Sequence, residues 1–142
     1  MEPNFKNGDY LVVDEISYRF ADPNRGDVIV FKFPGDPKQR YIKRIIGIPG
    51  ETVKIEEGKI TISNQEKSWV LDESNYLPSS LTTSSNEEIS LGNDEYFVLG
   101  DNRPFSSDSR RWGLLPRENI IGRVFLRALP FGAFAKIDAP SY

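Results

Sequence analysis

The chain has 142 residues, enough for one domain with a hydrophobic core, and a formal net charge of −3 from 18 basic and 21 acidic residues. This balance argues against a dedicated nucleic-acid binder, which would carry a basic face or stripe. Cysteine and histidine are both absent, which excludes disulfide bonds, thiol nucleophiles, cysteine-ligated zinc, Ser-His-Asp triads and histidine metal sites. A hydrolase of this composition needs another base, and lysine is the main candidate at neutral pH.

The order of apolar segments and turn signals predicts a mostly β domain of coiled antiparallel sheets that spans residues 1–142. Runs of β-branched and aromatic residues predict strands, with turn clusters at 21–27 and 34–39 between the first three of them. Residues 63–94 are rich in Ser, Thr, Asn and acidic residues and predict a long surface excursion. The predicted strands are 10–16, 28–33, 40–48, a hairpin at 52–62, 95–100 and 119–131.

No apolar run approaches the ~20 residues of a membrane-spanning helix, and no secretory signal segment precedes the first predicted strand. If the protein acts at a membrane, we therefore expect its anchor to lie outside these residues. Phe131 and Phe134, in the segment ALPFGAFAKI, are interpreted as core residues or as part of a surface that touches lipid.

The segment YIKRIIGIPG, residues 41–50, places two cations within an apolar strand. Alternation puts Tyr41, Lys43 and Ile45 on one face and Arg44 on the other. One interpretation is an edge strand whose basic side chains extend their charged ends into water. The other is that Lys43 is buried as a base, because burial lowers the pKa of a lysine amine toward neutral pH, whereas a guanidinium stays protonated.

A second polar segment, GDNRPFSSDSRRWG at residues 100–113, follows a predicted strand. As a plain loop, it would contain turn-capping residues, a surface ion pair between Asp108 and Arg110 worth under ~1 kcal/mol, and Trp112 as a packing residue. As a site, its serine hydroxyls would orient a lysine amine. A calcium loop built from Asp94, Glu95, Asp101 and Asp108 is a third interpretation, although their spacing matches no EF-hand.

Four segments together resemble the type I signal peptidases, the bacterial leader peptidase family of membrane-bound serine proteases that remove signal peptides from exported proteins. They follow one another in the family's order and cover residues 1 to about 131. The last two resemble the family's lysine box and final signature. The segments are MEPNFKNGDYLVVD, RGDVIVFKFP, YIKRIIGIPGE and GDNRPFSSDSRRWG.

The resemblance implies a Ser/Lys dyad on a fold of the signal-peptidase and LexA-like type, with no metal and no cofactor. Lys43 stands at the position of the general base, and Ser106 at that of the hydroxyl that orients the amine. Asp108 and Arg110 match a supporting ion pair, and the loop beneath the site matches Gly100, Asp101, Asn102 and Arg103. The excursion at 63–94 lies where the family inserts a variable second subdomain.

The resemblance also implies the substrate and the cellular place. Small apolar pockets would accept the Ala-x-Ala-like residues before the cleavage point of a signal peptide, which would add as a strand beside residues 40–43. The partners would be exported preproteins and a lipid surface, not nucleic acid, at the extracytoplasmic face of the bacterial cytoplasmic membrane. The positions that match the cleft are Met1, Phe5, Leu11, Val30, Arg40, Tyr41 and Ile42.

One departure concerns the nucleophile. In the family, the catalytic serine immediately precedes the Met of the Met-x-Pro segment, and here that Met is Met1. We therefore expect the nucleophilic serine, an upstream oxyanion-hole serine and the transmembrane anchor to be absent from these 142 residues, which would then be soluble and inactive on their own. The absence of a DNA-binding segment and of an internal Ala-Gly site argues against a self-cleaving repressor domain. A non-catalytic binding or assembly module stays open as the alternative.

Overall fold

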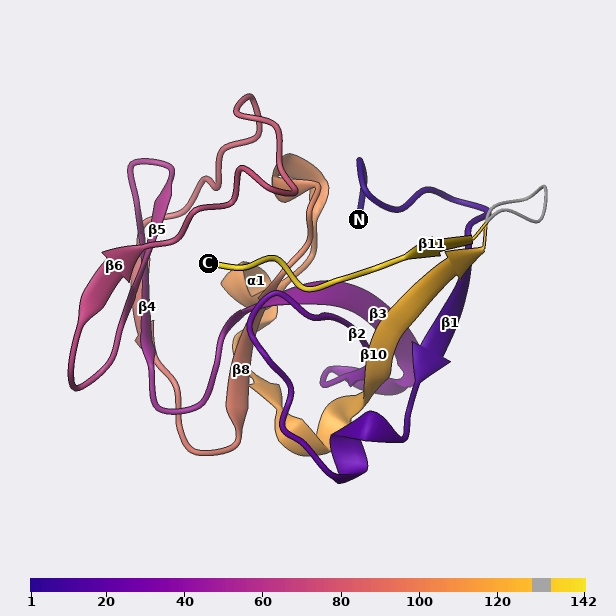
Figure 1. Cartoon of the computed structure of the whole chain (residues 1–142). Helices are drawn as coiled ribbons and strands as arrows, with labels where there is room; N and C mark the ends of the chain where they lie inside the picture. Colours follow the sequence, from indigo (N-terminus) through magenta and orange to yellow (C-terminus); the bar gives the residue numbers. More distant parts are fainter. Residues whose placement is uncertain (129–133) are drawn as a thin grey trace.

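The computed structural model describes residues 1–128 and 134–142, which form two antiparallel sheets. Strands of the larger sheet lie in the order β1-β10-β2-β3-β8-β9, with β11 paired to the end of β10 (Figure 1). Its strands are β1 (Tyr10–Asp14), β2 (Val28–Phe33), β3 (Asp36–Gly47), β8 (Glu95–Leu99), β9 (Leu115–Pro116), β10 (Ile120–Ala128) and β11 (Phe134–Lys136). Single-turn 3-10 helices at Ser17–Arg19, Arg103–Phe105 and Arg117–Asn119 and a short helix, α1 (Ser109–Trp112), connect them. The mostly β fold class is confirmed.

The smaller sheet has the order β6-β5-β4-β7 and lies to one side of the larger one (Figure 1). The hairpin predicted at 52–62 forms its centre, with residues 57 and 58 at positive φ in a two-residue turn. Strands from the excursion flank this hairpin, so the range 63–94 as a separate subdomain stays a prediction. The four strands are β4 (Thr52–Glu56), β5 (Lys59–Ser63), β6 (Ser68–Val70) and β7 (Glu87–Ser90).

Three groups of buried side chains hold the sheets together. One group joins the smaller sheet to β3 and β8, through residues such as Ile46, Ile55 and Phe97. A second lies on the face of β2 and β3 that carries Phe31 and Ile45. A third lies on the opposite face, where Phe5, Val28 and Val124 pack with Leu11, Val30 and Ile42. Both faces of β2 and β3 are therefore covered, which explains their continuous apolar runs.

The structure lengthens β3 beyond its predicted start. The turn predicted at 34–39 is wrong, because Phe33 pairs with Asp36 and only residues 34 and 35 form the turn. Pro37 lies within the strand near the tip of this hairpin, where a missing N–H is tolerated.

The edge-strand interpretation of β3 holds for only part of it. Arg44 pairs with both β2 and β8, and Ile45 and Gly47 pair with β8, whereas Asp36 and residues 40–43 pair with β2 alone. Lys43 is thus the last residue of β3 before its pairing with β8 begins at Arg44.

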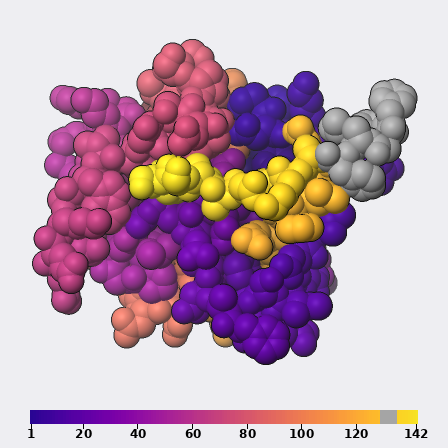
Figure 2. Space-filling view, viewed as in Figure 1, coloured from indigo at the N-terminus to yellow at the C-terminus, as the bar shows by residue number. Residues whose placement is uncertain are grey.

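The C-terminal residues lie across the surface from β11 toward the excursion, as a ridge visible in Figure 2. Pro140 and Tyr142 approach Gly26 so closely that a Cβ atom there would lie 2.7 Å from the proline ring. Among residues 1–128 and 134–142, no helix is long and apolar enough to cross a membrane. The predicted role of Phe131 lies outside the described residues.

Candidate active site

Lys43 lies at the junction of β3 and β8, with its side chain partly shielded from water. Its amine donates a hydrogen bond to the carbonyl of Ile42 at 3.0 Å and lies 5.5 Å from the ring centre of Tyr41. Burial lowers the pKa of Lys43 below its ordinary value, and the nearby carboxylates of Asp108 and Asp101 oppose this effect without reversing it. The amine is therefore easier to deprotonate than a lysine in water.

Arg44, the other cation of this strand, lies on the opposite face and is buried. Its Nε and Nη2 donate to the two carboxylate oxygens of Asp101, both at 2.9 Å, and its Nη1 donates to the carbonyl of Gly26 at 3.0 Å. The ring of Tyr76 covers the guanidinium at 4.1 Å. The interpretation of Arg44 as a surface cation is wrong, because Asp101 from the signature segment neutralises its charge within the fold.

The Asp108–Arg110 pair is also buried, so its interpretation as a surface ion pair is wrong. Arg110 donates to both carboxylate oxygens of Asp108, at 2.9 and 2.8 Å, and the backbone N–H of Gly100 donates to the same carboxylate at 3.1 Å. Burial raises the pKa of Asp108, but the Arg110 guanidinium, together with the backbone N–H of Gly100, more than offsets this effect and holds that pKa below its usual range. Asp108 also caps the N-terminus of α1, which fixes the far end of the loop.

Arg103 anchors the middle of the same loop and has a fully buried side chain. Its guanidinium donates to the carbonyl of Gly100 at 3.1 Å and to the hydroxyl of Thr83. It also forms a two-pronged ion pair with Glu73 at 2.8 and 2.5 Å, and Glu73 accepts a further bond from Tyr76 at 2.7 Å. Glu73, Tyr76 and Thr83, all in the excursion, were not predicted to support this loop, because no local pattern distinguishes them from their polar neighbours.

The side chains of Ser106 and Lys43 both pack against the Cα atom of Gly100. A Cβ atom on Gly100 would lie 2.0 Å from the Ser106 Oγ and 3.6 Å from the Lys43 Cδ, so only a glycine fits here without displacing the serine. The Ser106 hydroxyl is buried and has no hydrogen-bond partner among the described residues. It lies near enough to Asp108 to contribute to that group's low pKa, but this contact does not have the geometry of a hydrogen bond.

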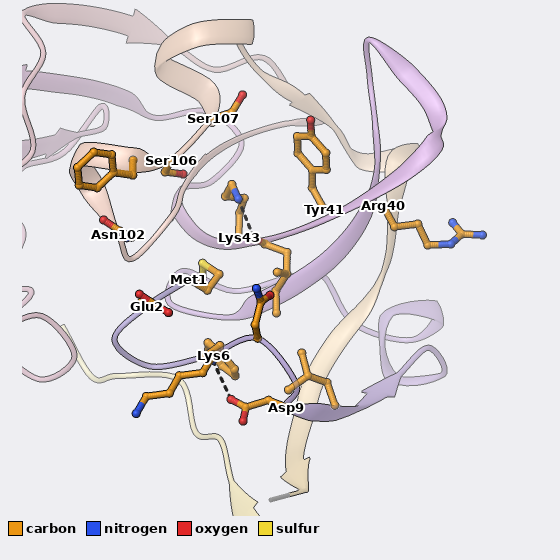
Figure 3. A pocket seen from close by; sticks show the side chains of 15 residues that line it. Met1, Glu2, Lys6, Asp9, Arg40, Tyr41, Lys43, Asn102, Ser106 and Ser107 are labelled. Carbon is orange, nitrogen blue, oxygen red and sulfur yellow. Dashed lines mark hydrogen bonds between the residues drawn. The ribbon is translucent and has the colours of Figure 1, made fainter. Parts of the chain in front are cut away.

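A groove of about 480 Å³ runs along the free edge of β3, between this strand and the N-terminal segment (Figure 3). Lys43 and Ser106 approach each other in one wall, whereas Arg40 points away along the strand. The groove unites most of the residues that the resemblance implies, namely Met1, Phe5, Leu11, Arg40, Tyr41, Ile42, Lys43, Asn102 and Ser106. Its lining also includes residues that the sequence did not single out: Glu2, Lys6, Asn7, Asp9, Phe105 and Ser107.

Val30 is the expected cleft residue that the groove does not include. It packs beneath the groove with Leu11 and Ile42. Phe105, by contrast, is 87% exposed at the groove's edge, next to Ser106. An apolar side chain that stands this far into solvent beside a groove is available to a bound peptide.

The carboxylates of the calcium interpretation do not gather into one site. Asp101 and Asp108 are each held by an arginine, and Glu95 accepts the backbone N–H of Gly92. Within the part of the chain that the structure describes, no three carboxylates are grouped as metal ligands.

Comparisons with known proteins agree with this geometry. Residues 1–129 match the family model of "Signal peptidase, peptidase S26". The chain is 40% identical to signal peptidase I of Leptolyngbya laminosa, over 99% of this chain and 70% of that protein. It is 38% identical to a probable signal peptidase I-2 of Synechocystis, over 92% of this chain and 59% of that protein, so it spans about three fifths of that relative's length.

A crystal structure of a signal peptidase I from Enterococcus faecalis superimposes with a TM-score of 0.60 and 29% identity, over 73% of this chain and 97% of the other. The likeness thus covers both the fold and the segments that build the groove. The chain belongs to the signal peptidase I family, peptidase S26, a family of serine-type endopeptidases.

Proposed function

We propose that the protein to which residues 1–142 belong removes signal peptides from exported preproteins by acyl transfer, with Lys43 as the general base of a Ser/Lys dyad. The observation that carries this proposal is the partly buried Lys43 amine, whose pKa is lowered and which lines the groove. A base works best when its pKa lies near the pH at which it acts, and this environment moves a lysine in that direction.

The position of Met1 supports a serine nucleophile immediately upstream. Met1 lines the groove together with Lys43, and its sulfur accepts the backbone N–H of Asp101. Because Met1 and Lys43 line the same groove, a serine joined to Met1 would enter that groove on the side of Lys43.

The unpaired hydroxyl of Ser106 supports its role as the group that orients Lys43. Buried hydroxyls are nearly always hydrogen-bonded, so an unpaired one beside an amine suits a bond that forms when Lys43 turns from the Ile42 carbonyl toward the groove. Asp108, Arg110, Arg103 and the loop around Gly100 would hold Ser106 in place.

The chemistry follows from these groups. Neutral Lys43 takes the serine proton while the serine oxygen bonds to the scissile carbonyl carbon, and the protonated amine then gives the proton to the leaving amine as the peptide bond breaks. Lys43, neutral again, takes a proton from water as the water oxygen attacks the ester carbon. The bond to the serine oxygen then breaks, Lys43 returns the proton to that oxygen, and the signal peptide leaves with its new carboxylate. No metal or cofactor takes part in these steps.

The groove supports an extended substrate. Residues 40–43 of β3 have an unpaired edge to which a peptide can add as a strand, and the apolar side chains of Met1, Phe5, Leu11 and Ile42 suit small apolar residues before the cleaved bond. We place this reaction at the extracytoplasmic surface of the bacterial cytoplasmic membrane, as the family's substrates require.

Cleavage of a labelled peptide with an Ala-x-Ala site tests the proposal. We expect residues 1–142 alone to bind this peptide without cutting it, and the protein extended upstream through its serine and anchor to cut it. In the extended protein, Lys43→Ala should lower kcat by at least ~100-fold, the usual contribution of a general base.

Lys38→Ala is the matched control, because Lys38 is an exposed lysine of the same strand that does not line the groove. It should leave kcat and KM within about twofold of the parent values. Full activity of Lys43→Ala would refute the assignment of the base, and cleavage by residues 1–142 alone would refute that of the nucleophile.

A further inference from the structure

Another cavity, of about 540 Å³, opens beyond the Arg40 end of the groove. Arg40 lines both spaces, so they meet at this residue. The apolar part of the second cavity is formed by aliphatic side chains of three strands, Val13, Val30 and Ile121, whereas Ile120 borders the cavity but packs with Phe31 in the core on the opposite face. Charged side chains, including Glu15, Lys32 and Glu118, surround them.

The floors of the two spaces are continuous. Val30 lines the second cavity and pairs with Ile42, a groove residue, on the neighbouring strand. In the same ladder Lys32 pairs with Arg40, so these side chains share one face of the sheet. On β1, Leu11 lines the groove and Val13, which follows a register shift after Val12, lines the second cavity.

The direction of a bound peptide follows from the proposed function. If Lys43 marks the cleaved bond and the apolar pockets lie beside residues 41 and 42, the acyl side of the substrate runs along β3 toward Arg40. An extended chain advances ~3.3 Å per residue, as β3 itself does, so about three residues before the bond bring it to Arg40. The next residues upstream then enter the second cavity.

We propose that this cavity binds the end of the apolar segment of a signal peptide, about five to eight residues before the cleaved bond. Signal peptides carry an apolar stretch before their small-residue cleavage site, which matches the aliphatic floor. A cavity of this volume falls in the range of ordinary ligand sites. The inference rests on the proposed function and extends its substrate contacts beyond the groove.

Binding of three synthetic peptides to residues 1–142, measured by calorimetry, tests this subsite. The first peptide carries only the Ala-x-Ala sequence with flanking residues, the second adds about four leucines upstream, and the third adds serines in their place. We expect the leucine extension to tighten Kd by about tenfold over the first peptide, with a more negative heat-capacity change, because it buries apolar surface. The serine extension should change Kd by less than about twofold.

Val13→Ser and Ile121→Ser should each remove most of the gain from the leucine extension and leave binding of the short peptide unchanged. Val12→Ser is the matched control, since Val12 neighbours Val13 but is 46% exposed and does not line the cavity. Far-UV circular dichroism and urea unfolding of each variant ensure that only folded proteins are compared.

The outcomes separate this proposal from the one on which it rests. If the short peptide fails to bind, the groove assignment is wrong. If the short peptide binds but leucines add no more affinity than serines, the subsite is refuted while the groove stands. A gain that survives both cavity variants, or that Val12→Ser removes instead, places the upstream residues elsewhere and also refutes the subsite.

Discussion

Replacing Glu73 by Gln tests whether the excursion supports the signature loop. Glu73 is the carboxylate partner of Arg103, whose guanidinium is fully buried, through contacts of 2.8 and 2.5 Å. Removing one partner of a buried pair costs ~3–5 kcal/mol. Here Glu73 is 18% exposed and Arg103 keeps its bond to the Gly100 carbonyl, so we expect a loss of about 2 kcal/mol in the free energy of unfolding.

Urea unfolding of residues 1–142, followed by tryptophan fluorescence, measures this loss. With a slope of ~2 kcal/mol per molar urea for a chain of this size, the midpoint should fall by about 1 M. Glu88→Gln is the control, because Glu88 is an exposed glutamate of the same excursion, on β7. A change for Glu73→Gln no larger than that of Glu88→Gln would refute the reasoning, because the pair would then contribute nothing that an exposed charge does not.

Three further changes concern the site itself. Gly100→Ala places a methyl group 2.0 Å from the Ser106 Oγ and should lower the free energy of unfolding by ~1–3 kcal/mol. Gly92→Ala, whose methyl group would meet only the flexible end of the half-buried Glu95 side chain, should lower it by less. Equal losses in urea unfolding would contradict this. The pKa of Lys43 is lower in the folded state, so the unfolded chain binds more protons between that folded pKa and the unfolded value of ~10.4. The free energy of unfolding should therefore rise with pH in this range, and the rise should disappear in Lys43→Met. Thermal melts at several pH values in which Lys43→Met keeps the rise would refute this. The pKa of Asp108 is lower in the folded state, so its carboxylate stabilises the fold above the unfolded pKa of ~3.9, and this effect is lost as pH falls through the folded pKa. Asp108→Asn should therefore lose less stability than the parent protein below about pH 4. An acid unfolding profile identical to that of the parent would contradict this prediction.

Local patterns predicted most strands because composition and alternation are local properties. The strand 28–33 is observed with its predicted limits, and the hairpin at 52–62 with its turn. The limits of β3 were missed because the Pro and Gly residues near 34–37 are turn signals, and only pairing with β2 shows that the strand begins at Asp36. Strand order was also beyond local patterns, because it depends on which distant segments meet.

In the candidate site, too, features set by local sequence were predicted and contacts between distant segments were not. The prediction of a lysine base needs only the residue inventory, because histidine and cysteine are absent. The exclusion of Arg44 as a base needs only the chemistry of guanidinium, which stays protonated. That Arg44 is buried could not be predicted, because its partner Asp101 lies far along the chain and neither segment alone indicates the pairing. The contact of Glu73 with Arg103 was missed for the same reason, since one acidic residue in a polar excursion is indistinguishable from its neighbours.

The pairing of β1 with β10 determines when the groove can exist during synthesis. Tyr10 pairs with Ala128, so the residues up to 128 must leave the ribosome before the first strand finds its partner. Leu11, on one side of the groove, therefore stays unplaced while the strand that carries Lys43 is already made. The part of the groove that Leu11 lines therefore forms only after β10 has been made, whereas the strand that carries Lys43 can pair with β2 before that.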